Sequence, residues 1–263
     1  MSSMTHATLV IPSVFHDQLI WFMEHNAPLL QLIQVIVVTS DSHTTRASLD
    51  TYLANFTIHT IERPLGFAKT VNIGLRAATT DWIATCNDDV ELVEGWLDTL
   101  ISESSDSTAG MNPIITAPDG SIESAGIQVL PIGKALARTS DIPLKTYATE
   151  ALNAACVVYR RSALEAVGYF DERFGSYLED IDLSLSFSKA GWQQLIVPTV
   201  TIVHHRHQTA NKVLGKKKSF YDARNWWYIL AKHWSWRALI IHFPGIIVER
   251  ARNFSGILKA STA

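Results

Sequence analysis

The sequence is short of cysteine and has no excess of positive charge, and both features narrow the possible functions. Its 263 residues include two cysteines, Cys86 and Cys156, each within an apolar, strand-like segment. Cysteines in such segments are usually small buried hydrophobes, so we expect a reducing compartment and a cytoplasmic protein. The formal net charge is −3. A chain without a basic excess is not expected to have nucleic acid as its main partner.

Long apolar runs and two familiar phosphate-binding loops are also missing. No uncharged apolar run approaches the roughly 20 residues that span a bilayer, and residues 1–7 lack the basic and apolar regions of a signal peptide. No Gly-x-Gly-x-x-Gly follows the first apolar segment, and no Gly-Lys-Ser/Thr loop occurs. The sequence therefore does not support either of these two nucleotide-binding modes.

Apolar strand-like segments alternate with helical patterns over the first ninety residues. The expected strands are Thr8–Ile11, ended by Pro12, then Gln34–Thr39, Thr57–Ile61 and Trp82–Cys86, and the expected helices are residues 18–24, a segment through Leu49 and Leu53, and residues 67–78. This alternation is typical of a sheet covered by helices on both faces, with right-handed crossovers. We therefore expect an α/β fold with a doubly wound, mostly parallel sheet and flanking helices.

The second half of the chain is less regular. A helix is expected over residues 92–101, and residues 117–120 (Ala-Pro-Asp-Gly) indicate a hairpin turn between two strand-like segments. Residues 131–150 carry no clear pattern and are expected to form an irregular, mobile loop. The other expected elements are a strand at 154–159, a helix at 162–167 ended by Gly168, a helix from 179 to near Gly191, and a strand at 194–203.

Two adjacent acids, Asp88 and Asp89, directly follow the expected strand at 82–86. Ligands of open α/β sheets bind outside the carboxyl ends of the strands. Carboxylate oxygens at such a place can hold a divalent cation, which would neutralise a diphosphate. The alternative is a polar turn, since Asn and Asp are favoured in turns. From position alone the two interpretations carry similar weight.

Two further polar clusters lie at the ends of expected elements. Glu179, Asp180 and Asp182 stand at the head of a helix, where one or two acids would simply complement the helix dipole. The preceding glycine and aromatic residues make that explanation less complete for the whole cluster. His204-His205-Arg206-His207 closes the strand at 194–203, and its histidines are either metal ligands or part of a basic loop.

Residues 211–263 form a different, aromatic-rich segment. Lys216-Lys217-Lys218 precede several Phe, Tyr and Trp residues between 220 and 236, and an apolar run follows at 238–248. The favoured interpretation is a pair of helices packed on the domain. The alternative is a surface that rests on a membrane, with lysines near anionic head groups and tryptophans at the boundary.

Three blocks of the sequence, taken in order, match the pattern of a known enzyme family. They are Gly66-Phe67-Ala68 with Asn72, Gly74 and Ala77, then Asn87-Asp88-Asp89, and then residues 168–183. Asp119-Gly120, Ala125-Gly126 and Arg224-Asn225-Trp226 fit the same pattern. The combination resembles family 2 glycosyltransferases with the GT-A fold, particularly the rhamnosyltransferase-like branch. It covers about residues 8–230 and implies a GT-A domain at 1–210 with a helical extension at 211–263. The domain would comprise a nucleotide-sugar half at about 1–105 and an acceptor half at about 106–210.

The resemblance also implies a metal site. Asp89 would hold a divalent metal, Mn or Mg, as a Lewis acid on the diphosphate of the donor. His205 would complete the coordination, with His204 and His207 as alternates. Asp88 would bind the donor ribose or support the metal.

The remaining implied roles divide between acceptor and donor. Asp180 would be the base that deprotonates the acceptor hydroxyl, with Glu179 shaping the acceptor site. The expected donor-binding residues are Pro12, Asp41, Arg63, Lys69, Asn72 and Asp88. The sequence departs from the family pattern at Thr39, where an Asp usually holds the nucleobase, at Asn87, the first position of the acidic motif, and at Arg63, where Asn is more usual.

The expected function is inverting, metal-dependent transfer of a sugar from a nucleotide diphosphate-sugar to a hydroxyl of a glycan or lipid-linked acceptor. The extension at 211–263 would provide peripheral membrane contact or a homo-oligomer interface. One alternative is a catalytically silent sugar-nucleotide or glycan binding domain on the same fold, although the Glu179-Asp180 pair argues against it. A nucleotidyltransferase would usually need a glycine-rich, basic loop after the first strand, and residues 12–16 provide none.

Overall fold

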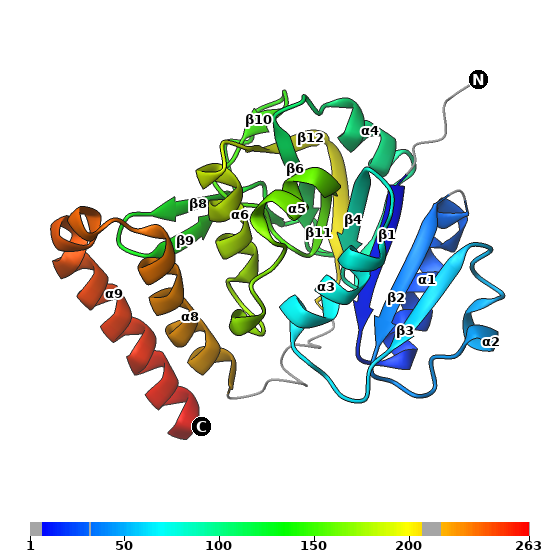
Figure 1. The fold of residues 1–263 in the computed structure, drawn as a ribbon, viewed down its shortest axis with the longest axis horizontal. Helices are drawn as coiled ribbons and strands as arrows, with labels where there is room; N and C mark the ends of the chain where they lie inside the picture. The colour runs from blue at the N-terminus through cyan, green and yellow to red at the C-terminus, as the bar shows by residue number, and fades with distance from the viewer. Residues whose placement is uncertain (1–6, 32, 207–216, 263) are drawn as a thin grey trace.

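The computed structural model describes residues 7–31, 33–206 and 217–262, with the backbone alone at 217–218 and 254–262. Its centre is a ten-stranded sheet with the strand order β10-β12-β6-β11-β4-β1-β2-β3, to which β5 adds on β12 and β7 on β6 (Figure 1). The strands of this sheet are β1 (Ala7–Ser13), β2 (Gln34–Thr39), β3 (Phe56–Thr60), β4 (Trp82–Cys86), β5 (Val90–Glu91), β6 (Thr108–Thr116), β7 (Ile122–Ser124), β10 (Tyr147–Ala148), β11 (Cys156–Arg160) and β12 (Gln193–His204). A separate hairpin pairs β8 (Ile127–Leu130) with β9 (Lys134–Ala137).

The long strands run mostly in one direction. β4, β1, β2 and β3 pair in parallel, and so do β6 and β12. β11 is the exception, because it runs antiparallel to both of its neighbours, β4 and β6. The doubly wound, mostly parallel sheet expected from the sequence is therefore confirmed. The buried free cysteines Cys86 and Cys156 face each other across the β4–β11 pair.

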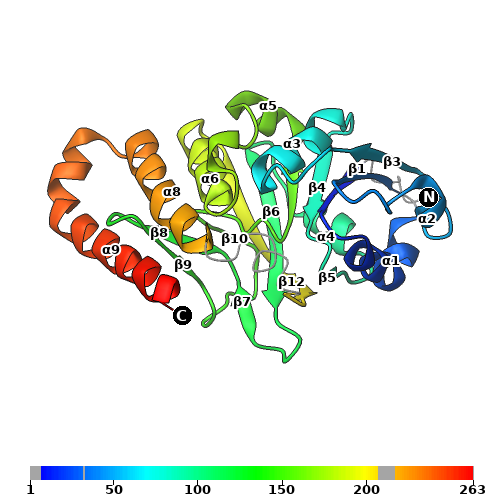
Figure 2. The same cartoon turned by 90° about the horizontal axis from the view of Figure 1, so that it is seen from below.

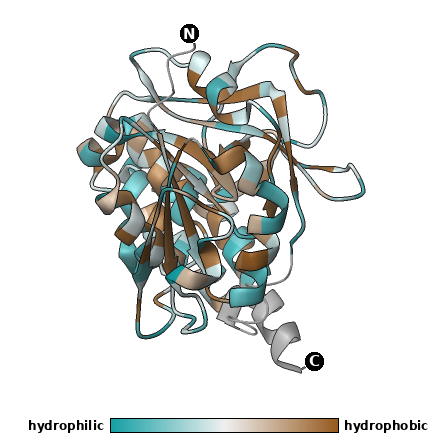
Figure 3. Cartoon of the chain, turned by 90° about the vertical axis from the view of Figure 1, so that its right-hand side faces the viewer, coloured by the Kyte–Doolittle hydropathy of each residue, from teal (hydrophilic) through white to brown (hydrophobic). Residues whose placement is uncertain are grey.

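Helices cover both faces of this sheet (Figure 2). They are α1 (His16–Leu30), α2 (Arg46–Leu49), α3 (Phe67–Ala77), α4 (Trp96–Ser102), α5 (Arg161–Val167) and α6 (Glu179–Lys189), with a 3-10 turn at Glu172–Phe174. Buried residues of α1 and α4 share one core with the sheet, and those of α3, α5 and α6 share the other. The strands are accordingly the most hydrophobic part of the interior (Figure 3).

Two helices end the chain, α8 (Lys217–His233) and α9 (Trp236–Thr262). Trp226 and Ile229 of α8 are buried in a third cluster with Phe174 and Ile181. The predicted helix pair packed on the domain is therefore confirmed. Lys216 and His207 lie outside the described residues.

Four details of the predicted elements were wrong. β1 does not end at Pro12 but continues to Ser13, because Pro12 and Ser13 still pair with Val38 and Thr39 of β2, whereas the pairing with β4 stops at Val10. Residues 131–150 are not an irregular loop, since they contain β9 and β10, and Gly133 (φ +73°) closes the β8–β9 turn. Helix α4 starts at Trp96 instead of residue 92, after Gly95 in a left-handed conformation. The segment expected to be helical through Leu53 has only the four-residue helix α2.

Candidate active site

Asp88 lies just beyond β4 and is only 5% exposed. Its carboxylate is held from two other elements: Ser13 Oγ at the end of β1 donates to Oδ2 at 2.5 Å, and Gln18 Nε2 on α1 donates to Oδ1 at 2.7 Å. Burial raises the pKa of Asp88 to about 7, the neighbouring charge of Asp89 adds to the rise, and the two hydrogen bonds only partly oppose it. Ser13 and Gln18 were not expected from the sequence, where nothing marks them.

Asp89 is brought to the histidines by a short strand pairing. β5 begins directly after Asp89 and pairs antiparallel with the end of β12, with His204 opposite Val90. As a result His204 Nε2 lies 3.2 Å from Asp89 Oδ1. The backbone N–H of His205 donates to the Asp89 carbonyl at 2.8 Å, but its side chain points to Glu91, with Nε2 3.1 Å from Oε2. The structure thus places His204, the alternate, at the Asp89 carboxylate.

A third residue, Glu123 on β7, supports His204 from the other side. Glu123 Oε2 lies 3.0 Å from His204 Nδ1, and Arg206 Nε lies 2.5 Å from Glu123 Oε1. Burial alone would lower the pKa of His204, but the hydrogen bonds and charges of Asp89 and Glu123 outweigh it and raise that pKa. The only sequence signal for Glu123 is an acid within an otherwise apolar segment, and sequence reasoning missed it.

This donor set suits a divalent cation. Two buried carboxylates and an imidazole oriented by a further carboxylate are ordinary components of protein metal sites. Across the described part of the chain, no three His, Cys, Asp or Glu side chains form a ready-made metal cluster. Cations such as Mg²⁺ are commonly bound through one or two carboxylates plus substrate phosphates, so a complete protein cage is not required.

Glu179 and Asp180 begin helix α6 after a constrained backbone. Tyr177 and Leu178 have φ angles of +69° and +65°, a region that residues with a side chain rarely adopt. Asp180 accepts backbone N–H bonds from Ile181 at 2.8 Å and Ala154 at 3.4 Å. Glu179 is 7% exposed, and its buried Oε2 has no hydrogen-bond partner among the described residues.

The pKa values of Glu179 and Asp180 are both raised. Burial raises the pKa of Glu179 well above its ordinary value, and the charge of Asp180 raises it further. Burial also raises the pKa of Asp180, but the backbone N–H groups that it accepts from oppose the rise. Donors to a carboxylate stabilise its charged form, so the bonds from Ile181 and Ala154 favour the ionised state of Asp180.

The segment before β11 connects the two acidic pairs. The N–H of Asn87 donates to the carbonyl of Ala155 at 2.8 Å. The residue before Ala155, Ala154, donates its own N–H to Asp180 Oδ2. β11 runs antiparallel to β4, so the start of β11 lies beside the end of β4. Asp88-Asp89 and Glu179-Asp180 therefore face the same edge of the sheet.

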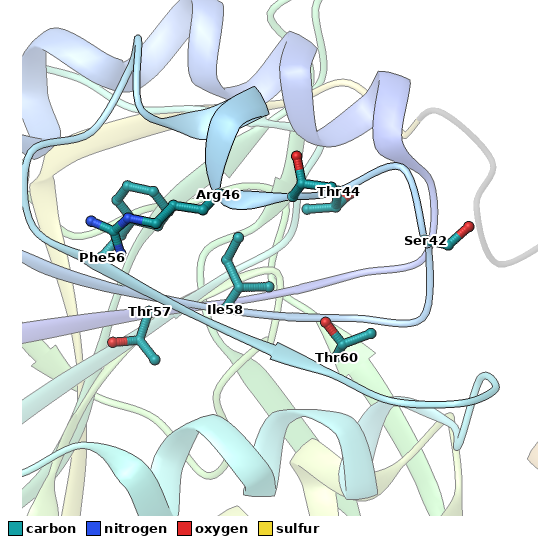
Figure 4. Close-up of a pocket in the computed structure, with 8 residues that line it drawn as sticks. Ser42, Thr44, Arg46, Phe56, Thr57, Ile58 and Thr60 are labelled. Atoms are coloured by element: carbon teal, nitrogen blue, oxygen red, sulfur yellow. The ribbon is translucent and has the colours of Figure 1, made fainter.

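Asp41 anchors the neighbouring loop after β2. Its carboxylate accepts from the backbone N–H groups of His43 and His16, both at 2.9 Å, and these bonds lower its pKa. A hollow between the ends of β1 and β2 is lined by Phe15, His16, Asp17, Asp41, Ser42, His43 and Thr45. A second hollow lies against β3, where Arg46 covers the ring of Phe56 at 4.7 Å (Figure 4). The lining of neither hollow includes the two acidic pairs.

The other residues expected to bind the sugar donor differ in their exposure and in their position along the sheet. Pro12 is half-buried in β1 beside Ser13. Arg63 follows β3 and Lys69 is in the first turn of α3, both exposed and both at the edge of the sheet where the acids lie. Asn72 is not at that edge: it is 1% exposed, and its amide exchanges hydrogen bonds with the backbone of Phe170 at 2.9 and 3.1 Å.

Helix α8 holds the loop that leads into Glu179. Asn225 is fully buried, and its Nδ2 lies within donor distance of the carbonyls of Phe174 (3.0 Å), Ser176 (3.0 Å) and Tyr177 (2.6 Å). Further along, Asp182 of α6 is paired with two α8 residues, Lys232 and His233, each at 2.7 Å. Sequence reasoning missed the role of Asn225, because its partners lie about fifty residues upstream and no periodicity links them.

Comparison with known proteins is consistent with this geometry. The model of glycosyl transferase family 2 matches residues 25–168. The chain is 29% identical to the N-acetylglucosaminyl-diphospho-decaprenol L-rhamnosyltransferase of Mycobacterium tuberculosis, with 60% of each chain covered. It is 31% identical to the pre-mycofactocin glycosyltransferase of that organism, over 73% of this chain and 41% of the relative.

A solved structure shows the fold. The mannosyltransferase PcManGT from Pyrobaculum calidifontis, in complex with GDP-Man and Mn²⁺, superposes with a TM-score of 0.65 at 13% identity, covering 98% of this chain and 74% of that one. The resemblance expected from the sequence blocks is confirmed by these matches. The chain belongs to glycosyl transferase family 2 and has the GT-A fold.

Proposed function

We propose that this protein is an inverting, metal-dependent glycosyltransferase that moves a sugar from a nucleotide diphosphate-sugar to a hydroxyl of a glycan or lipid-linked acceptor. The observation that carries the proposal is the short link through residues 154 and 155: Ala155 accepts from the N–H of Asn87, directly before Asp88-Asp89, and Ala154 donates to Asp180. The name of the mycobacterial rhamnosyltransferase, with its diphospho-decaprenol acceptor, supports a lipid-linked acceptor.

The donor would lie along the ends of β1, β2 and β4. The hollow at Phe15, His16 and Asp41 is suited to a nucleoside, and it follows the end of β1, where Pro12 lies and where Ser13 donates to Asp88. The exposed cations Arg63 and Lys69 would lie near the diphosphate. A divalent cation held by Asp89 and a histidine would neutralise the diphosphate as a Lewis acid. We assign that histidine as His204 because it is the one in contact with Asp89, and His205 becomes the alternate.

The transfer step uses the Glu179-Asp180 pair. The carboxylate of Asp180, whose charged form is favoured by two backbone N–H groups, takes the proton of the acceptor hydroxyl as that oxygen attacks the anomeric carbon. The bond from the anomeric carbon to the diphosphate breaks, and the diphosphate leaves with the electron pair. Attack from the face opposite the leaving group inverts the anomeric configuration. Burial raises the pKa of Glu179, which favours its protonated form, and that form can donate a hydrogen bond to the acceptor.

Calorimetric titration with a panel of nucleoside diphosphates, with Mn²⁺ and with chelator, tests the donor site. We expect metal-dependent binding of one nucleotide, lost in Asp89→Ala and retained in Asp81→Asn, a control at a side chain that is 89% exposed. If the folded protein binds none of the nucleotides with Mn²⁺ present, the chain is a silent domain instead.

Asp180→Asn tests the base. We expect it to abolish transfer with donor affinity nearly intact, because the amide keeps the shape of the side chain but cannot take the proton. Unchanged turnover together with weakened donor binding would overturn the assignment.

A further inference from the structure

Helix α9 has an exposed side that is as apolar as a protein core. Within the described residues of α9 this side consists of Trp236 (67% exposed), Ile240 (65%), Ile241 (72%), Phe243 (60%), Ile247 (43%) and Val248 (52%), which we call the outer face. Residues 236, 240, 243 and 247 are separated by four, three and four positions, so they form one stripe along the helix. An apolar area of this length on an isolated chain marks an interaction surface.

The opposite side of α9 is already occupied. Ile246 and Arg250 are buried, and an Arg250 nitrogen donates to the carbonyl of Gly133 in the β8–β9 turn at 2.5 Å. A Cβ on Gly245 would come within 2.6 Å of Ile132, so the helix backbone lies directly on that turn. In both views α8 lies between α9 and α6, and α9 forms the outermost element (Figure 1; Figure 2). The outer face therefore points away from the body of the protein.

The exposed charges that the described residues of α9 contribute beside the outer face are positive. Arg237 and Arg252 are exposed, the latter at 70%. The only acid in the sequence of α9 is Glu249, whose side chain is 8% exposed and paired with Lys134 and Arg252. An apolar helix face with tryptophan at one end and only cations exposed beside it complements the surface of an anionic bilayer.

The geometry fits a helix that lies on a membrane. Among the residues that the structure describes, no helix combines the length and apolarity needed to cross a bilayer. Pro244 and Gly245 also interrupt the apolar run of α9. A helix with one side bound to its own domain can only rest in the interfacial region of the lipid, parallel to the surface.

We propose that the outer face of α9 docks this protein on an anionic lipid bilayer. The docked helix is joined through α8 to the acceptor side of the site, because Asn225 holds the loop at 174–177 and Asp182 is paired with Lys232 and His233. Docking would thus bring Glu179-Asp180 close to the membrane. This last step rests on the proposed function with a lipid-linked acceptor, whereas the docking itself does not.

Vesicle flotation of the full chain tests docking without any substrate. We expect the protein to float with vesicles of phosphatidylcholine plus phosphatidylglycerol and far less with phosphatidylcholine alone. The double variant Ile240→Gln, Phe243→Gln should lower the affinity at least about tenfold, since two large apolar side chains leave the lipid. The matched control is Leu144→Gln, which alters an apolar residue that is 92% exposed outside α9 and should leave flotation unchanged.

A second variant keeps the test independent of apolar packing. Arg237→Glu should weaken the preference for anionic vesicles while the melting temperature is preserved, and Arg252 is left unchanged because it is paired with the buried Glu249. Equal flotation of wild type and the glutamine variant, or no flotation of folded wild type, would overturn the proposal. The proposal would also be overturned if light scattering shows that the wild type is a dimer, the glutamine variant is a monomer, and vesicles leave the wild-type dimer intact. The outer face would then bind a second copy of the chain. Nucleotide calorimetry needs no lipid, so failure of docking and failure of the proposed function give separate results.

Discussion

The buried carboxyl of Asp88 makes the stability of the metal-free protein depend on pH in an unusual direction. Its pKa is about 7 in the folded chain and has a reference value of 3.8. Between those two values the folded state holds a proton that the unfolded state has released. The free energy of unfolding therefore falls as the pH rises from about 4 to about 7, and it stays low above that pH.

Asp88→Asn should remove this loss. A difference of about three pKa units at 1.36 kcal/mol per unit gives about 4 kcal/mol as the upper limit of the penalty at pH 8. Asparagine keeps the shape of the side chain but has no proton to lose. The stability of the variant relative to wild type should therefore rise by up to about 4 kcal/mol between about pH 4 and about pH 8.

Urea denaturation in the presence of a chelator, followed by circular dichroism across this pH range, measures the effect. Asp81→Asn is the matched control, because Asp81 is 89% exposed and the same substitution there should give a nearly flat difference. The reasoning is refuted if the difference between Asp88→Asn and wild type is the same at every pH. A difference that falls as the pH rises would mean that Asp88 is stabilised in its charged form.

Three other substitutions test the contacts around the site. His204→Ala should weaken Mn²⁺ binding in the presence of nucleoside diphosphate by about tenfold or more, as measured by electron paramagnetic resonance. His205→Ala should change the Mn²⁺ affinity by less than about threefold. A larger loss of affinity in His205→Ala than in His204→Ala would assign the ligand to His205. Asn225→Asp should lower kcat without weakening donor binding, because a carboxylate would face three carbonyl oxygens in the loop before Glu179 and disturb that loop. A loss of donor affinity in calorimetry as large as the loss of kcat would contradict this. Asp182→Asn should destabilise the protein by about 2–4 kcal/mol in urea denaturation, since Lys232 loses a buried counter-charge and the buried His233 loses its carboxylate hydrogen-bond partner. A loss below about 0.5 kcal/mol would show that α8 is held by apolar contacts alone.

The predictions that succeeded depend on local patterns. Alternating strands and helices are encoded by periodicity within each segment, and Asp88-Asp89 falls at a strand end for the same reason. The choice between His204 and His205 depends instead on the register of β12 against β5. Neighbouring residues of a strand point to opposite sides, so a shift of one position would exchange them, and no local pattern reports that register.

Other features escaped because their cause lies far away in the sequence. Asn225 matches the family pattern, but its role becomes visible only when α8 brings it to the carbonyls of Phe174, Ser176 and Tyr177. Glu123 acquires its role only when β7 pairs beside β6 and reaches His204 at the end of β12. Asn72 matches a family block, yet the packing of α3 directs it to Phe170.

The place of β11 in the sheet has a consequence for how the chain folds as it is synthesised. β11 lies between β4 and β6, although both of those strands precede it in the sequence. Until residue 160 has left the ribosome, β4 keeps one unpaired edge, which is a template for association with other chains. Pairing over such sequence separations is slow, because the loop entropy must be lost before the contacts form. Ala154 and Ala155, directly before β11, bond Asp180 and Asn87, so the link between the two acidic pairs also forms only after this part of the chain has been synthesised.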